Sequence, residues 1–260
     1  MKVGWWEQAQ ADVRAEDDWL GAWERSHLGG LRFPKRRADW RLGRWTAKHA
    51  VADYLDLSHD PGTLARIQIQ PATSGAPEVF IDEPPGDISI SLSHRDGIAA
   101  CAVGAPGALL GCDLEVVEPH SDAFVADYFT AEEQAMTRQA PEPLRYALMA
   151  LIWSAKESAL KALRTGLRID TRCVSVTIDN SCIAGLSSEP LSAHENSVAV
   201  PPAAPVWQPL RVSHADGQIF DGWWFRSGLV RTMVSIPATE APEQFCSCHV
   251  QVERAFRPAL

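Results

Sequence analysis

The stretch GCDLEVVEPH, residues 111–120, alternates acidic side chains with apolar ones. Because successive side chains of a strand point to opposite faces, Asp113 and Glu115 share one face of the expected strand. Two anions about 6–7 Å apart repel by about 2–3 kcal/mol at an effective dielectric of about 20. Either water on an exposed face absorbs this repulsion, or a cation offsets it.

Strand and turn patterns surround this stretch. The alternating runs ISISLSH at 88–94 and IAACAV at 98–103 flank an Asp-Gly pair, which is typical of a β-hairpin. We expect LLGCDLEVV, residues 109–117, to be the third strand of a meander with this hairpin. Further strands are expected within 65–70, 73–82, 173–179, 209–214, 220–225 and 229–236. The Pro- and Ser-rich segment 187–205 is expected to be an exposed loop.

The first helical region carries a cluster of basic residues. Residues 32–48 include seven Lys or Arg and one acid. A helix is expected to begin after Pro34 and to stop at SHDPG, residues 58–62. In a chain whose net charge is -9, this basic helix is either a solvated face or the contact for a polyanionic ligand.

The second helical region covers about residues 121–163. Thr130 and Glu133 have the spacing of a capping box, in which the hydroxyl and the glutamate each accept a hydrogen bond from a free backbone N–H. Gly166 is expected to end the last helix of this region.

Two segments of these helices resemble each other. WTAKHAVADYL begins at Trp45 and WSAKESALKAL at Trp153, and an alternating strand follows each. We interpret the chain as α+β, with two similar halves in a pseudo-twofold arrangement, each a long helix packed on a small antiparallel sheet; chance similarity is the alternative. The halves are expected to span 1–108 and 109–240, with a C-terminal tail at 241–260. Ligands favour the crevice between two such halves.

The second of these segments contains a glutamate–lysine pair that the first lacks. Glu157 and Lys161 lie one helical turn apart, and alone they would be a surface pair worth roughly 0.3 kcal/mol. They occur in the same half as Asp113 and Glu115. Glu157 is therefore a candidate third ligand for a divalent cation, because carboxylate oxygens suit Mg²⁺, which also binds substrate phosphates.

Four short motifs together resemble those of the 4′-phosphopantetheinyl transferases. GCDLE at 111–115 resembles the family's G-x-D-x-E motif, and WSAKESALK at 153–161 resembles W-[ST]-x-K-E-[AS]-x-x-K. SLSH at 91–94 resembles its L-S-H segment, and residues 36–44 resemble its basic R-R…G-R segment. The resemblance covers about residues 32–180 and is strongest to the long, two-half type that activates peptide and polyketide synthetases, including the surfactin synthetase.

This resemblance implies a reaction. Such enzymes transfer the 4′-phosphopantetheine arm of coenzyme A to a serine of an apo acyl or peptidyl carrier protein and release 3′,5′-adenosine bisphosphate. Asp113, Glu115 and Glu157 would hold Mg²⁺ on the pyrophosphate of coenzyme A. Glu157, or a water on the metal, would take the serine proton. Lys161 would meet the negative charge that develops on the phosphate.

The resemblance also implies contacts with coenzyme A. His94 would contact a phosphate, most directly the 3′-phosphate; without the motif it would be an ordinary hairpin-turn histidine. The full set of expected coenzyme A-binding residues is Arg37, Arg44, Lys48, Ser93, His94 and Lys156. The carrier protein would dock against the second half, where an apolar set could receive a carrier helix or could simply be core. That set is Phe124, Val125, Phe129 and Met136.

One position departs from the family pattern. The family often has G-K-P ahead of the L-S-H segment, and its lysine touches the nucleotide. Here the corresponding residues are Gly75, Ala76 and Pro77. Coenzyme A would then bind more weakly or through a neighbouring arginine. Two other functions stay open: a metal-dependent nucleotide phosphohydrolase that uses the same acids, and a non-catalytic module that binds coenzyme A or a carrier protein.

The composition narrows the class of protein. A chain of 260 residues with 46% hydrophobic and 22% charged residues is typical of a globular protein with a sizeable core. The net charge of -9 argues against general nucleic-acid binding. We see no signal peptide or membrane span, and we expect a cytoplasmic monomer with no nucleic-acid or membrane partner. The six cysteines contain no CxxC pair, and Cys246 and Cys248 are either a redox or metal pair or incidental thiols.

Overall fold

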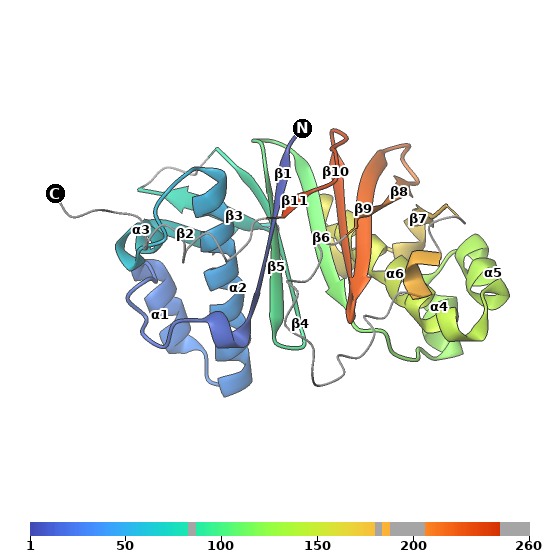
Figure 1. Cartoon of the computed structure of the whole chain (residues 1–260), viewed down its shortest axis with the longest axis horizontal. Coiled ribbons are helices and arrows are strands. Elements are labelled where there is room, and N and C mark those ends of the chain that lie inside the picture. The colour runs from blue at the N-terminus through green and yellow to red at the C-terminus, as the bar shows by residue number, and fades with distance from the viewer. Residues whose placement is uncertain (83–86, 180–183, 188–205, 245–260) are drawn as a thin grey trace, which may run out of the picture.

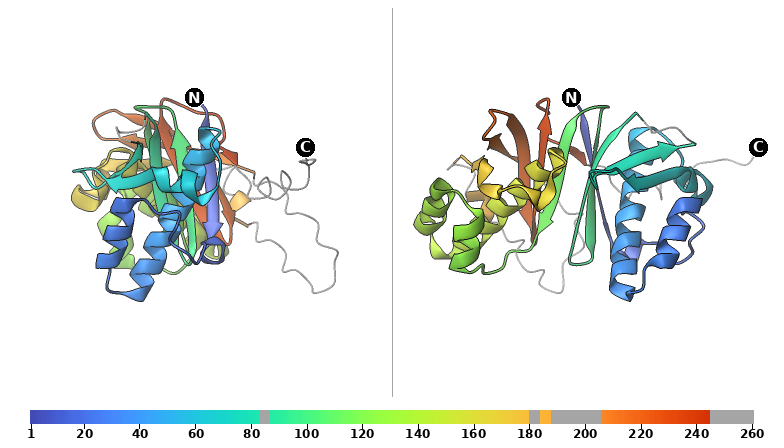
Figure 2. Two further views of the ribbon diagram at one scale, coloured as in Figure 1. Left: turned by 90° about the vertical axis from the view of Figure 1, so that its left-hand side faces the viewer. Right: turned by 180° about the vertical axis from the view of Figure 1, so that it is seen from behind.

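Two β-sheets lie next to each other at the centre of the molecule, and helices cover their outer sides (Figure 1). The computed structural model describes residues 1–82, 87–179, 184–187 and 206–244. The strand order is β11-β1-β5-β4 in the first sheet and β6-β10-β9-β8-β7 in the second. Seen from behind, the helices again lie at the two ends, with the sheets between them (Figure 2). The α+β class is confirmed.

The elements follow one another along the chain in two groups. The first group is β1 (Val3–Ala9), α1 (Ala22–Gly30), α2 (Pro34–Tyr54), α3 (Pro61–Arg66), β2 (Ile67–Pro71), β3 (Pro77–Ile81), β4 (Ser89–Arg95) and β5 (Ile98–Gly104). The second is β6 (Leu109–Glu115), α4 (Asp122–Tyr128), α5 (Ala131–Gln139), α6 (Glu142–Ala162), β7 (Val174–Thr177), β8 (Gln208–His214), β9 (Ile219–Ser227), β10 (Leu229–Ile236) and β11 (Glu243–Gln244). Strand β11 returns to the first sheet and pairs in parallel with β1.

The hairpin of β4 and β5 is confirmed, but the predicted meander is wrong. Asp96 and Gly97 both have positive φ, 50° and 73°, as a type I′ turn requires. The next strand, β6, instead pairs with β10 in the second sheet. Side chains of β4 satisfy two N–H groups of β6, since Cys112 N donates to Ser91 Oγ (2.9 Å) and Leu114 N to Ser93 Oγ (3.2 Å).

The two faces of β6 meet different partners. Leu110, Cys112 and Leu114 pack between the two sheets in one apolar cluster with residues of β1, β5 and β10. The opposite face meets α6, and the approach is so close that a Cβ at Gly111 would overlap the carbonyl oxygen of Ser158. The alternation of the quoted stretch therefore separates an apolar face between the sheets from a carboxylate face toward α6.

A buried lysine–glutamate pair ties α2 to its surroundings. The Lys48 ammonium lies 2.5 Å from Glu24 of α1, and both side chains are 0% exposed. Lys48 also donates to the carbonyls of Trp19 (3.0 Å) and Leu64 (2.9 Å). Glu24 in turn accepts from the backbone N–H of Ile69 (3.0 Å). Because each charge is paired and hydrogen-bonded, the desolvation penalty of burying both is offset.

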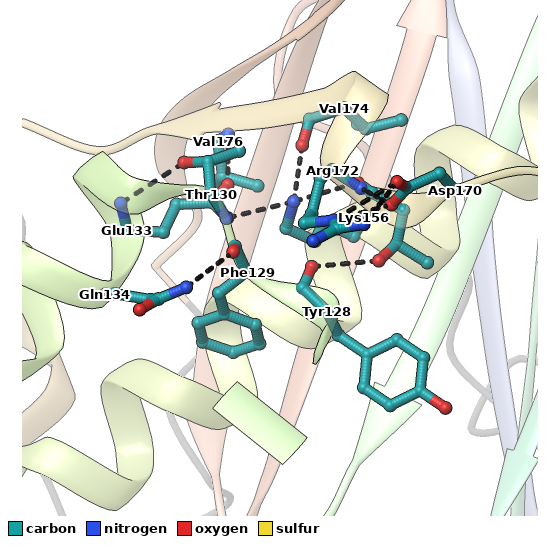
Figure 3. Close-up of polar contacts among 11 residues, drawn as sticks. Tyr128, Phe129, Thr130, Glu133, Gln134, Lys156, Asp170, Arg172, Val174 and Val176 are labelled. Carbon is teal, nitrogen blue, oxygen red and sulfur yellow. Dashed lines mark hydrogen bonds and ion pairs between the residues drawn. The ribbon is translucent and has the colours of Figure 1, made fainter. Parts of the chain in front are cut away.

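The same arrangement recurs around α6 (Figure 3). The Lys156 ammonium lies 2.9 Å from Glu133 of α5 and donates to the carbonyls of Thr171 (3.0 Å) and Val174. Glu133 accepts from the N–H of Val176 (2.8 Å). Burial lowers the pKa of Lys156, and Glu133 opposes that shift.

Lys48 and Lys156, which the motifs place among the coenzyme A-binding residues, are therefore inaccessible to a ligand in this structure. Both are 0% exposed, and each ammonium group is already surrounded by a glutamate and backbone carbonyls. The capping box that sets Glu133 in place is confirmed. Thr130 N donates to Glu133 Oε2 at 2.8 Å, and Glu133 N donates to Thr130 Oγ1 at 3.3 Å.

Two helix ends differ from the sequence prediction. Helix α2 ends at Tyr54, and SHDPG also begins a new helix, α3, in which Asp60 accepts from Thr63 N at 3.0 Å. Helix α6 ends at Ala162 rather than at Gly166, because Arg164 already has a left-handed backbone with φ of 57°.

Some predicted features lie outside the described residues: the loop 188–205, the last sixteen residues from 245 to 260, and with them Cys246 and Cys248. Within the described part of the chain, no helix is both long and apolar enough to cross a membrane.

The contact at Gly111 gives a first test. Replacing Gly111 with alanine should lower the free energy of unfolding by about 3 kcal/mol or more, because α6 must move away from β6. Urea unfolding followed by circular dichroism measures this. The matched control is Gly43→Ala in α2, where an added Cβ meets nothing within 4 Å; it should raise stability by about 0.5–1 kcal/mol. Equal stability of the two variants would contradict the close packing.

The buried pair gives a second test. Lys156→Met should lower the free energy of unfolding by about 3–5 kcal/mol, because Glu133 then keeps a buried charge without its partner. Lys35→Met is the control, since the Lys35 side chain is 91% exposed and should change stability by less than about 0.5 kcal/mol. A Lys156→Met variant as stable as the control would show that the pair does not hold α6.

Candidate functional site

Asp113 is held where β6 crosses α6. Its side chain is nearly buried, and Oδ1 accepts from Lys161 Nζ (2.7 Å) and from Ser93 Oγ (2.8 Å). Lys161 also donates to the Cys112 carbonyl at 3.0 Å. The second oxygen, Oδ2, is buried and has no hydrogen-bond partner among the described residues. A buried carboxylate oxygen without a partner is costly unless a ligand completes it.

Glu115 lies on the same face of β6 as Asp113. It is the last residue of the strand, further from Gly111, where α6 crosses β6. Its carboxylate lies 3.2 Å from Arg95 Nη2 and accepts from Val116 N at 2.9 Å. Burial raises the pKa of Glu115, and the charge of Asp113 adds to that effect.

Glu157 faces these two carboxylates from α6. Burial, together with the charges of Asp113 and Glu115, raises the pKa of Glu157 to about 7, although Lys161 and Arg95 oppose the shift. In the described part of the chain, the Glu157 carboxylate has no hydrogen bond or ion pair. The pKa of Glu157 is thus close to neutral pH, which is a common property of functional acids and bases.

The donor set fits a hard divalent cation in its chemistry. A cation among the three carboxylates would complete Asp113 Oδ2 and offset both the burial and the carboxylate charges that raise the pKa of Glu157. As the side chains lie, however, the described His, Cys, Asp and Glu residues form no group of three or more that could hold a metal ion. Lys161 and Arg95 lie against two of the carboxylates instead.

His94 joins the site from the end of β4. The His94 side chain is exposed at the end of the strand, but the atoms around it partly desolvate its ring and lower its pKa. The charged groups that act on it come from two sides. Asp39 and Lys35 belong to the first turns of α2, whereas Lys161 and Asp113 belong to the second half. The N-terminal part of the basic segment therefore faces the same place as the carboxylates.

The two arginines predicted on α2 differ in their surroundings. Arg37 Nη1 donates to the carbonyls of Leu28 (2.5 Å) and Leu31 (3.2 Å) at the end of α1, so it is bound to the fold. The Arg44 guanidinium lies 4.9 Å from the ring centre of Trp40, and its Nε is buried without a hydrogen-bond partner among the described residues. Burial lowers the pKa of Arg44. Arg44 is the better placed of the two to receive an anion.

A cavity of about 360 Å³ lies beside Lys161, and its lining residues come from 74–110 and from 161–168. One wall is the loop 74–77, which includes Ala76, together with β4; the other is the segment 161–168 at the end of α6. Arg168 links the two walls, because its Nη2 donates a hydrogen bond to the Ser74 carbonyl at 2.9 Å. A volume of about 360 Å³ is within the range of cavities that bind small ligands.

Several of these residues were not found by sequence reasoning. Arg95 follows His94 directly, but nothing in the motif marks it as the partner of Glu115. Arg164 and Arg168 continue the basic spacing of Lys161 at steps of three and four residues. That periodicity is a signal which could have found them.

The apolar set predicted for carrier docking is mostly core. Phe129 is 0% and Val125 8% exposed, and both belong to the cluster under α6. Phe124 and Met136 are only partly buried against that cluster. Phe124 also stacks with His120, at 4.3 Å between ring centres. Val125 and Phe129 are thus unavailable to a partner.

Residues 109–199 match the ACPS family model, described as the 4′-phosphopantetheinyl transferase superfamily. A holo-[acyl-carrier-protein] synthase of Chloroflexus aggregans is 41% identical over 54 residues. That alignment covers 21% of this chain and spans only 39% of the length of that synthase.

Two solved structures are similar to part of the chain. One is a holo-(acyl-carrier-protein) synthase from Bacillus anthracis in complex with CoA (3′,5′-ADP), with 18% identity, a TM-score of 0.35, and coverage of 39% of this chain and 92% of that one. The other is an ACPS-CoA complex from Chronobacterium ammoniagenes, with 20% identity, a TM-score of 0.32, and coverage of 40% and 96%. Asp113, Glu115, Glu157 and Lys161 all lie within residues 109–199, the segment that matches the model of the 4′-phosphopantetheinyl transferase superfamily.

Proposed function

We propose that the protein is a Mg²⁺-dependent 4′-phosphopantetheinyl transferase of the long, two-half type. It would transfer the phosphopantetheine arm of coenzyme A to a serine of an apo acyl or peptidyl carrier protein and release 3′,5′-adenosine bisphosphate. One observation carries the proposal: the crossing of β6 and α6 brings Asp113, Glu115, Glu157 and Lys161 together, within the segment that matches this superfamily.

Coenzyme A would bind in the crevice, with its phosphates toward the cations there. Lys161 lies at the carboxylates and also lines the cavity. His94 and Arg44 are the candidates for the remaining phosphate contacts, because His94 faces charged groups of both halves and Arg44 Nε has no partner in the described chain. Arg37 contributes less directly, since it holds the end of α1. Ser93 orients Asp113 rather than the ligand.

Asp113, Glu115 and Glu157 are the residues that would hold the magnesium ion. When bound, Mg²⁺ would neutralise the pyrophosphate and the charge that develops on it. Because Lys161 and Arg95 now pair with Asp113 and Glu115, the carboxylates would have to exchange these partners. Lys161 would then be free to bind the phosphate.

Glu157 would accept the proton of the carrier serine. The serine oxygen attacks the phosphorus next to the pantetheine arm, the P–O bond to the second phosphate breaks, and 3′,5′-adenosine bisphosphate leaves. Before a cation is bound, burial and the neighbouring acids make Glu157 a stronger base than a solvated glutamate, as its raised pKa indicates, and a bound cation would reduce this shift. Lys161 stabilises the negative charge of the phosphoryl group as the bond breaks.

The matching lysine–glutamate pairs support a duplicated chain with halves at about 1–108 and 109–240. In each half, the helix that precedes the long helix carries a glutamate: Glu24 on α1 and Glu133 on α5. This glutamate pairs with a buried lysine of the long helix and accepts a hydrogen bond from a strand N–H. The C-terminal segment from 241 contributes β11 to the first sheet. We propose that the active protein is a cytoplasmic monomer and that the carrier protein binds at the crevice.

Removing one carboxylate tests the activity. Incubation with coenzyme A, Mg²⁺ and a panel of apo carrier proteins should add the mass of phosphopantetheine to a carrier. Glu157→Gln should lower kcat by about 10²-fold or more, because both the base and a metal ligand are lost. Glu142→Gln, at the exposed start of the same helix, should leave kcat unchanged.

The other outcomes of this assay separate the alternative functions. Phosphate release without a carrier mass gain would identify a phosphohydrolase. Binding of coenzyme A without turnover would identify a non-catalytic module. Either result, or full activity of Glu157→Gln, would refute the proposed transferase mechanism.

The raised pKa of Glu157 gives a test that needs no activity. Its folded-state pKa of about 7 lies above the unfolded value of 4.5, so the folded protein keeps a proton that the unfolded chain loses between these values. Stability should therefore fall as the pH rises from 4.5 to 7 and then level off. In metal-free buffer, Glu157→Gln should be more stable than the wild type by about 1 kcal/mol at pH 5 and about 3 kcal/mol at pH 8.

Thermal melts with and without Mg²⁺ complete this test. Mg²⁺ at pH 8 should raise the Tm of the wild-type protein and have little effect on Glu157→Gln, because the ion binds only when the carboxylate is present. A stability difference that does not change with pH, or an equal response of both proteins to Mg²⁺, would rule out the arrangement of charges described above.

A further inference from the structure

An arginine occupies a backbone position that favours glycine at the end of α6. Arg164 has a φ of 57°. Its N–H donates to the Lys161 carbonyl (2.9 Å), and Thr165 N donates to the Leu160 carbonyl (3.1 Å), which together close the helix. Helices that end this way usually have glycine at the left-handed residue, because a side chain is disfavoured there. Strained positions of this kind are often kept for a function of the side chain.

Arg164 is an exposed residue on the lining of this cavity. The other cations on its wall, Lys161 and Arg168, are already in use. Lys161 binds Asp113 and the Cys112 carbonyl, and Arg168 donates to backbone carbonyls on both walls of the cavity. Within the described part of the chain, the Arg164 guanidinium has neither a hydrogen bond nor an ion pair.

The lining of this cavity indicates the chemistry of a ligand. Among the described residues, three cations and no carboxylate line it, in a chain with a net charge of -9. Hydroxyl groups of Ser89, Ser91 and Thr165 lie on the same walls, and Leu110 and Pro77 supply apolar surface. A cavity of about 360 Å³ with these groups suits a phosphorylated organic molecule of nucleotide type.

A role in helix capping does not account for Arg164. A cation near the C-terminus of a helix interacts favourably with the last carbonyls. Here that contact is made by Arg168, which donates to the carbonyls of Thr165 (2.8 Å) and Arg164 (3.1 Å). The side chain of Arg164 donates to none of the carbonyls described, so glycine at this position would end the helix at least as well.

We propose that Arg164 binds a phosphate of the nucleotide part of coenzyme A in this cavity, across from Ala76. The assignment rests on the proposed function and adds a specificity-determining residue to it. Ala76 offers no charge on the opposite wall, and Arg164 supplies the cation from the second half. The chain thus binds the nucleotide through the end of its catalytic helix.

Replacing Arg164 with glycine separates binding from folding. Arg164→Gly should weaken coenzyme A binding roughly tenfold in isothermal titration calorimetry, because one charge-assisted contact is lost. Its Tm should equal or exceed that of the wild type, because glycine favours the left-handed backbone. Arg164→Lys should recover part of the affinity. In the Arg164→Gly background, Ala76→Lys should also restore binding by returning a cation to the cavity.

The control is Asp56→Gly, which relieves a left-handed residue (φ 53°) after α2. Asp56 does not line the cavity, and this variant should bind coenzyme A as the wild type does. Dephospho-coenzyme A identifies the phosphate: if Arg164 binds the 3′-phosphate, the affinity for this analogue will not change in Arg164→Gly, and if Arg164 binds the pyrophosphate, the affinity will fall as it does for coenzyme A.

The results distinguish this assignment from the function on which it rests. Equal coenzyme A affinity of the wild type and Arg164→Gly, with transfer activity present, would overturn the role of Arg164 and leave the transferase intact. A wild-type protein that binds no coenzyme A would overturn the proposed function and this assignment with it.

Discussion

The close crossing of α6 over β6 is the contact on which the site depends. Because Gly111 has no side chain, the backbone of α6 at Ser158 can lie directly on the strand. The next residues on that face, Asp113 and Glu115, then meet the Glu157–Lys161 side of the helix. The charges of these three carboxylates act on one another in a partly buried place, which disfavours their ionised forms. Such an effect is typical of sites that receive a cation or a substrate.

The two long helices show how one framework carries different chemistry. Lys48 and Lys156 make equivalent buried pairs. At the position after each lysine, α2 has His49 where α6 has Glu157. Burial lowers the pKa of His49 to about 4, and its ring packs on Trp45, 4.2 Å between ring centres. Helix α2 therefore has a neutral imidazole among aromatic rings at this position, whereas α6 has a carboxylate that faces Asp113 and Glu115.

Local signals in the sequence predicted local structure well. The Asp-Gly hairpin and the capping box at Thr130 depend on residues a few positions apart, and both are present. The partner of β6 could not be predicted in this way, because β10 lies more than a hundred residues further along the chain. The burial of Lys156 likewise depends on Glu133 and on carbonyls beyond the helix. A motif identifies such a lysine, but only the packing around it decides whether a ligand can reach it.

A crystal structure with coenzyme A and Mg²⁺ would test the central claim most directly. One ion should be bound to oxygens of Asp113, Glu115 and Glu157 and to the pyrophosphate, with Lys161 moved from Asp113 to a phosphate. An ion bound elsewhere, with Lys161 still paired to Asp113 and the three acids apart, would contradict it.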